Sequence, residues 1–255
     1  MVAIEAPVLA PAVRRTLLDV ANVQTDLPPY ALMQGGLRPL KYEPVLHIGV
    51  LTDIPTDNSD KSFQKLRGQT KTPQLFGAYM GLDDPLLNGL GAGAPELEAL
   101  FTAGEALYVE DKVQKLVLSP AAVDLTPTPG TPLKDVKAAI GLLEQWHASR
   151  YLYRPTLSGN LLALNLIQSG TPATTETVNG TPIAAAAGYG TDGPGNAVST
   201  ASSAWLYISG QINVWKGEAA QATGPDLHRN RDLTLIEKRY AASVEGPVAA
   251  VLIGF

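Results

Sequence analysis

The clearest helical pattern of the chain lies between Pro95 and Leu118. Apolar and small residues recur there at the three- and four-residue spacing of one helix face, first as Leu97, Leu100, Phe101, Gly104, Leu107 and Tyr108, and then, displaced around the axis, as Val109, Val113, Leu116 and Val117. Pro95 suits a first helical turn, and Lys112 lies near the end where a positive charge is favoured. We predict a helix over 95–118 whose apolar face, Leu107 included, packs on the C-terminal strands.

Two further helices are predicted downstream. The first begins at about Thr131, a good N-cap, with Pro132 as its first helical residue. Its apolar stripe is Val136, Ile140, Leu143 and His147, with Trp146 alongside. The second covers 156–168 and is so rich in leucine that it must be mostly buried. The proline-rich segment 126–130 before these helices is a stiff connector and the best candidate for a domain boundary.

Strand patterns dominate the C-terminal third of the chain. Trp205 to Lys216 predicts two antiparallel strands around Gly210, in which Leu206, Ile208, Ile212 and Val214 share one sheet face. A short strand is predicted near Ile183. A long alternating strand covers 233–242, and the charges of 237–240 suggest a sheet edge or a subunit contact. The apolar run 248–253 is typical of a strand buried on both faces.

The first third of the chain has weaker patterns. Residues 1–44 hold no sustained periodicity and are interrupted by Pro28-Pro29 and Gly35-Gly36. We expect an arm that becomes ordered only on a neighbouring subunit, although an unstructured terminus is equally compatible with the pattern. Residues 45–84 indicate a hairpin-like excursion with a polar tip at 57–61.

Composition and charge narrow the class of protein. The chain has 255 residues, 45% of them hydrophobic, and a formal net charge of −5, which argues against tight binding to nucleic acid phosphates. It contains no cysteine, so disulfides, thiolate metal sites and cysteine nucleophiles are excluded. No apolar run reaches the ~20 residues that span a bilayer. We expect a soluble, unprocessed protein without membrane contact.

The residues that could carry chemistry do not form a recognisable site. His47, His147 and His228 lack the spacing of a zinc helix, and His147 on a helix stripe is better explained as a packed residue. The glycines of 89–93 precede a helix but lack the remainder of a phosphate-binding loop. Asp53, Asp57 and Asp60 lack the turn and distal glutamate of a calcium loop, and the serine-hydrolase pattern G-x-S-x-G is absent. We therefore predict no enzyme and no catalytic, cofactor-binding or metal-binding residues.

The order of these segments resembles the major capsid proteins of tailed bacteriophages of the Hong Kong 97 type, in the divergent form found in phages of actinobacteria. The resemblance covers about residues 90–255 and is carried by packing patterns and their order. These are Gly104-Glu105 in a long helix, the run 138–151 with Leu143-Glu144 at its centre, the strand pair around Gly210, Arg229-Asn230, Glu237-Lys238-Arg239-Tyr240, and the terminal Val-Ala-Ala-Val.

The resemblance implies an α+β fold of the Hong Kong 97 type with four parts. They are an N-terminal arm (1–44), an E-loop (45–84), a peripheral domain (85–130 and 210–242) with a spine helix over 95–118, and an axial domain (131–209 and 243–255). Some similar proteins crosslink subunits through an E-loop lysine. Lys61, Lys65 and Lys71 lie in that region, but no asparagine or glutamate partner is evident, so we predict no crosslink.

The function that the resemblance implies is that of a shell subunit. Similar proteins assemble as hexamers and pentamers into the icosahedral head around double-stranded DNA. Their partners include a scaffold, the portal and decoration proteins, with only weak non-specific contact to the packaged DNA. The implied location is the virion, with assembly in the host bacterial cytoplasm. Two alternatives remain open, namely a minor capsid or decoration protein of the virion and an encapsulin-like nanocompartment shell protein.

Overall fold

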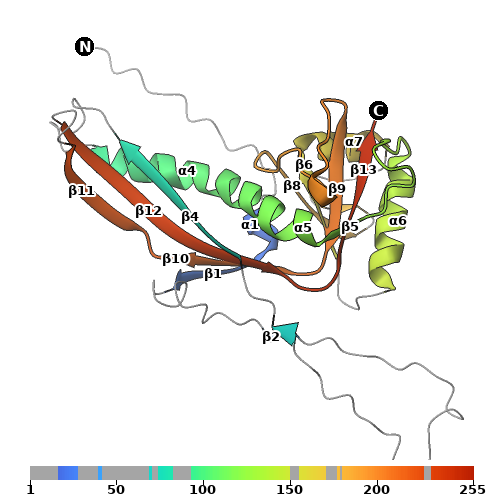
Figure 1. Ribbon diagram of the computed structural model, residues 1–255, viewed down its shortest axis with the longest axis horizontal. Helices are drawn as coiled ribbons and strands as arrows, with labels where there is room; N and C mark the ends of the chain where they lie inside the picture. The colour runs from blue at the N-terminus through green and yellow to red at the C-terminus, as the bar shows by residue number, and fades with distance from the viewer. Residues whose placement is uncertain are drawn as a thin grey trace, which may run out of the picture.

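The computed structural model describes residues 17–27, 40–41, 69–70, 74–82, 93–149, 155–170, 177–178, 180–226 and 231–255. This part of the chain is organised around two β-sheets. A long helix runs beside one sheet, and two shorter helices cover the other (Figure 1). No helix among the described residues is long and apolar enough to cross a membrane.

The five-stranded sheet is built around one long strand. This strand, β12 (Arg231–Val244), pairs antiparallel with β11 (Ala220–Asp226) over its first half and with β10 (Ile212–Gly217) over its second half. Its other edge pairs antiparallel with β4 (Gln74–Leu82). The fifth strand, β1 (Asn22–Leu27), runs parallel to β10.

The six-stranded sheet has the order β5-β13-β9-β6-β8-β7. Its strands are β5 (Ala122–Asp124), β6 (Thr156–Asn160), β7 (Thr177–Val178), β8 (Thr181–Ala186), β9 (Ser203–Ser209) and β13 (Val248–Gly254). The helices α6 (Val136–Ala148) and α7 (Leu161–Gly170) pack on one face. A short 3₁₀ turn, η3 (Pro194–Asn196), lies against β5. A separate pair joins β2 (Leu40–Lys41) to β3 (Gln69–Thr70).

Strand β13 separates two apolar cores. Val248, Ala250 and Leu252 face a junction core, which includes residues of both sheets and of the long helix. Ala249, Val251 and Ile253 face a distal core under α6 and α7. Since successive side chains of a strand point to opposite faces, a strand buried on both sides must be apolar throughout. The predicted two-sided burial of 248–253 is therefore confirmed.

The long helix changes its winding near its end. It consists of α4 (Gly93–Val113), a π-helical segment η2 (Gln114–Leu118) and a short α5 (Ser119–Ala121). The Ser119 N–H donates to the Gln114 carbonyl, five residues back, as a π-turn requires. Pro120 has no N–H and its ring would crowd the carbonyl four residues earlier, so a wider turn accommodates it. The change of winding lies where the predicted apolar stripe drifted.

The predicted orientation of this helix is wrong at two positions. Leu107 is 47% exposed and Leu116 is 37% exposed. The buried face is formed by Phe101, Val109, Val113, Val117 and Leu118. Polar side chains at buried positions of the same helix, described below, displace the apolar stripe from the spacing that the sequence suggests.

The predicted boundaries of the next two helices also need correction. Helix α6 begins at Val136, and its N-cap is Asp135, whose carboxylate accepts from the Ala138 N–H at 3.1 Å. The predicted start at Thr131 is therefore wrong, although the buried stripe is confirmed. Residues 156–160 form β6 instead of helix, and Asn160 caps α7 by accepting from the Ala163 N–H at 2.9 Å.

Two predictions about strand pairing are wrong. Strands β9 and β10 flank Gly210 but belong to different sheets, so Leu206 and Ile208 face the distal core while Ile212 and Val214 face the junction core. Strand β12 is central in its sheet, so the charges of 237–240 do not mark a sheet edge. Local patterns could not identify the antiparallel partners of β9 and β10, because β13 and β12 come from later parts of the chain.

Part of the predicted arm packs on its own subunit. Helix α1 (Leu17–Val20) buries Leu17 completely in the junction core, and β1 extends the five-stranded sheet. The expectation that the arm orders only on a neighbour is wrong for 17–27. The rest of the arm and most of the 45–84 excursion, including its polar tip, lie outside the described residues.

Candidate functional site: the junction between the two sheets

A charged cluster fixes the long helix to the five-stranded sheet. Glu105 on α4 binds Lys216 of β10 through Oε2 at 3.1 Å and Lys238 of β12 through Oε1 at 2.8 Å. Tyr240 of β12 donates its hydroxyl proton to Glu105 Oε1 at 2.9 Å. Gly104-Glu105 and 237–240, two patterns on which the resemblance rests, therefore meet in space.

The Glu105 carboxylate is stabilised in its ionised form. Burial alone would raise its pKa, but the hydrogen bonds from Lys238 and Lys216 outweigh burial and hold the pKa of Glu105 below its ordinary value. One carboxylate thus serves two ammonium groups in a largely covered position. Removing the carboxylate would leave both ammonium groups facing each other.

Glu110, one turn further along α4, is completely buried. Its Oε1 accepts from the Leu17 N–H and its Oε2 from the Gly188 N–H, both at 3.0 Å. Burial raises the pKa of Glu110, and the two backbone donors offset this only in part. One side chain therefore holds the segment before the five-stranded sheet and the loop after β8.

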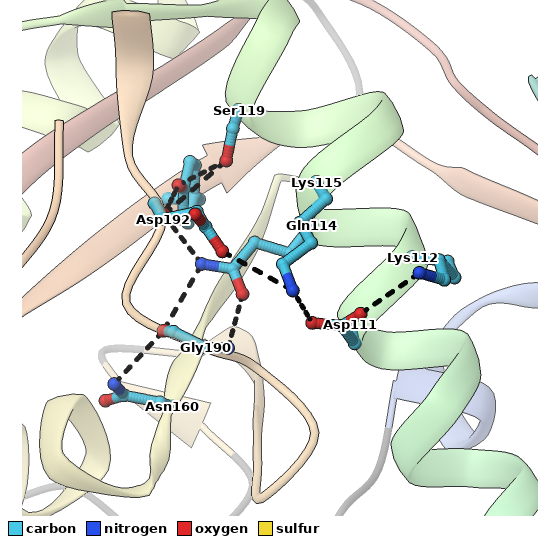
Figure 2. Close-up of polar contacts among 9 residues, drawn as sticks. Asp111, Lys112, Gln114, Lys115, Ser119, Asn160, Gly190 and Asp192 are labelled. Atoms are coloured by element: carbon cyan, nitrogen blue, oxygen red, sulfur yellow. Dashed lines mark hydrogen bonds and ion pairs between the residues drawn. The ribbon is translucent and has the colours of Figure 1, made fainter. Parts of the chain in front are cut away.

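Gln114 makes the next contact with the same loop, as Figure 2 shows. Its Oε1 accepts from the Gly190 N–H at 2.6 Å, and its Nε2 donates to the Asp192 carbonyl at 2.7 Å and, less closely, to the Gly190 carbonyl at 3.4 Å. Asn160, at the end of β6, also donates to the Gly190 carbonyl at 3.4 Å. The side-chain amide thus pairs with the loop backbone much as another strand would.

A hydroxyl pair extends this contact into the six-stranded sheet. Tyr207 of β9 donates to the Asp192 carbonyl, and its oxygen lies 2.8 Å from Ser119 Oγ. Because the Tyr207 proton is engaged with Asp192, Ser119 is the donor in the second contact. Burial raises the pKa of Tyr207 to about 12, so this phenol remains protonated at neutral pH.

Charged side chains lie at the outer side of the junction. Lys115 Nζ is 2.6 Å from Asp111 Oδ1 and 3.9 Å from Asp192 Oδ2, while Lys112 lies 3.6 Å from Asp111 (Figure 2). These groups are partly exposed, so each pair contributes at most about 1 kcal/mol.

Two glycines allow the loop to approach so closely. A Cβ on Gly188 would lie 2.4 Å from the Leu107 carbonyl, and one on Gly193 would lie 2.1 Å from Trp205 Cε2. Both distances are far below van der Waals contact. The loop over 188–193, which we call the junction loop, therefore packs directly on α4 and on the indole of Trp205.

The polar side chains of the junction hold the two sheets together through hydrogen bonds and ion pairs. In the part of the chain that the structure describes, no group of three or more acidic or histidine side chains could hold a metal ion. His147 is completely buried at the end of α6, as its interpretation as a packed residue predicts. His47, His228 and the aspartates 53, 57 and 60 lie outside the described residues, as do 83–92.

Sequence reasoning did not single out Glu110 or Gln114. A signal was present, since these residues are four apart and adjoin Val109 and Val113 of the buried stripe. Polar residues on the inner face of a helix must find partners, because a buried polar group without one is costly. The identity of those partners was not predictable.

No family model and no curated protein matches this chain. Solved structures do, at low sequence identity. The capsid of a native GTA particle is 11% identical, with 100% of this chain and 96% of the other covered and a TM-score of 0.56. The capsid protein of the Helicobacter pylori bacteriophage KHP30 is 10% identical, with coverage of 100% and 95% and a TM-score of 0.55.

A third similar structure is the SrpI encapsulin of Synechococcus elongatus PCC 7942. It is 9% identical, with 98% of this chain and 90% of the encapsulin covered, and the TM-score is 0.51. At this level of identity the likeness establishes the fold. The chain therefore has the mixed α and β fold found in phage capsid proteins and in an encapsulin shell.

Proposed function

We propose that the chain is the major capsid protein of a tailed phage, which assembles as hexamers and pentamers into an icosahedral head around double-stranded DNA. The observation that carries the proposal is the extent of the fold match. It covers 100% of this chain and 96% of the matching chain from the capsid of a GTA particle, so the two chains share the fold over nearly their whole lengths. Scaffold, portal and decoration proteins are the expected partners, and the virion is the expected location.

The arrangement of the described elements supports this assignment. We assign α4 and its π-helical extension as the spine helix and the five-stranded sheet as the core of the peripheral domain. The six-stranded sheet with α6 and α7 is assigned to the axial domain. Residues 45–84 would form the E-loop, whose final part, β4, is anchored in the five-stranded sheet, and the part of 1–44 before β1 would form the arm.

A structural role also agrees with the chemistry of the junction. Its buried polar groups bind backbone atoms of the same chain, as Glu110 and Gln114 do. Such contacts fix distant segments of the chain relative to one another. These contacts are those expected of a structural protein, in which Glu110 and Gln114 stabilise the folded subunit.

An encapsulin-like shell is the second candidate, because the SrpI encapsulin also matches over nearly the whole chain. The two functions differ in what the shell encloses. A phage head should hold nuclease-resistant double-stranded DNA and carry a portal, whereas a nanocompartment should co-purify with an enclosed protein and without DNA.

Electron microscopy of the purified full-length chain, alone and with a scaffold protein encoded beside it, tests the proposal. Closed icosahedral shells are expected in at least one condition. The variant Val113→Asp, which places a charge in the junction core, should give none and identifies contaminating particles. Subunits that stay monomeric in both conditions at high concentration would contradict the shell function.

A further inference from the structure

Two short connections cross side by side between the sheets. Residues 210–211 join β9 to β10, and residues 245–247 join β12 to β13. The Glu245 N–H donates to the Gln211 carbonyl at 2.8 Å, so the two crossings are joined by a hydrogen bond. Gly246 has a φ of 74°, a backbone conformation that residues other than glycine rarely adopt. Together these crossings form a narrow strap between the two sheets.

The long helix joins the two sheets away from this strap. It is fixed to the five-stranded sheet through Glu105 and passes into β5, at the edge of the six-stranded sheet. Between these points Gln114 holds the junction loop, which follows β8 of the six-stranded sheet. Figure 1 shows α4 and α5 reaching from one sheet to the other.

A contact away from a hinge axis fixes the angle about that axis. The contact of Gln114 with Gly190 and Asp192 meets this condition, and it consists of directional hydrogen bonds to backbone atoms. Gln114 is only 1% exposed. Water can therefore replace its hydrogen bonds only if the junction loop moves away from the helix.

We propose that the two sheets can tilt about the strap, that the contact of Gln114 with the junction loop is a latch that fixes the angle between them, and that this angle sets the curvature of the assembled shell. The last part of this inference rests on the proposed shell function. A closed shell of one size requires its subunits to meet within a narrow and defined set of angles. A subunit whose two sheets can tilt would instead meet its neighbours at several angles and form shells of several sizes.

The variant Gln114→Met tests the latch, because methionine has a similar length and no amide. In soluble subunits, hydrogen exchange of the Gly190 amide should become about tenfold faster, the factor that about 1.4 kcal/mol corresponds to. After assembly, electron microscopy should show more than one particle diameter or unclosed sheets. Gln145→Met, at an exposed position of α6, is the matched control and should leave both measurements unchanged.

Gln114→Asn serves as a milder second variant if Gln114→Met does not fold, since it keeps a side-chain amide but ends one carbon short of the Gly190 and Asp192 backbone. Unchanged Gly190 exchange in the folded variant would refute the latch. Faster exchange together with a single particle diameter, equal to that of the wild type, would refute its link to curvature. Absence of shells from the wild-type chain would refute the proposed function, while the exchange measurement would still decide the latch.

Discussion

Lowering the pH from 7 to 4 should destabilise the folded chain through His147. This side chain is completely buried on the inner face of α6, and burial lowers its pKa from the ordinary 6.5 to about 4. As the pH falls, His147 therefore takes up a proton in the unfolded chain at a higher pH than in the folded chain. Stability that is fully present above pH 6.5 is lost as the pH falls towards the folded pKa of about 4.

The magnitude follows from the two pKa values. The gap from 6.5 to about 4, at ~1.4 kcal/mol per pKa unit, gives a loss of roughly 3 kcal/mol across this window. Natural domains have free energies of unfolding of only about 5–15 kcal/mol, so the loss would be easily measured.

Urea unfolding followed by tryptophan fluorescence provides the assay, on wild type and His147→Gln at several pH values from 7 to 4. Glutamine cannot take up the proton, and the carboxylates that titrate in both proteins cancel in the difference. The difference between their free energies of unfolding should therefore change by roughly 3 kcal/mol over the window. Gln145→His, which adds an exposed histidine next to Trp146, is the control and should show no such change.

A difference that stays constant within about 0.5 kcal/mol from pH 7 to 4 would refute the reasoning. It would mean that burial does not suppress protonation of His147 in the folded chain.

Three further predictions concern packing and charge. Val113→Asp should destabilise the subunit by at least about 4 kcal/mol, whereas Leu107→Asp should change its stability by less than about 1 kcal/mol, and the reverse order in urea unfolding would show that the helix is turned the other way. Glu105→Gln should cost about 2 kcal/mol or more at pH 7. The pKa of Glu105 is lowered in the folded chain, so the stability that its carboxylate contributes is fully present at pH values above the ordinary pKa of a glutamate and is lost as the pH falls through the folded pKa. The effect of Glu105→Gln should therefore shrink in acid, and an equal effect at pH 7 and pH 3 would contradict this. Gly193→Ala should displace the indole of Trp205 and alter its near-ultraviolet circular dichroism, and an unchanged spectrum with unchanged stability would show that the junction loop is not tightly packed.

Local patterns in the sequence were sufficient for several elements. The spacing of apolar residues located the long helix, and its start at Gly93 lies two residues from the predicted one. The stripe of α6 and the two-sided burial of β13 were also correct. These features depend on residues only a few positions apart, so the spacing of apolar residues along the sequence is enough to predict them.

Pairing between strands was not predictable in the same way. Nothing near Gly210 shows that β9 and β10 enter different sheets, since both segments are apolar and suited to burial. Likewise, the strand pattern of 156–160 was hidden by the leucines that continue into α7. The choice between strand and helix was made there by the neighbours β8 and β9.

The sequence by itself determined which segments are apolar, where the long helix runs, and that polar residues interrupt the apolar stripe of this helix. Only the tertiary structure decided what those residues do. Glu110 meets Leu17, 93 positions away, and Gln114 meets Asp192, 78 positions away. A buried polar side chain must be satisfied, but the fold alone brings its partner within reach, because hydrogen bonds act over a few ångströms and the chain separates these residues by tens of positions.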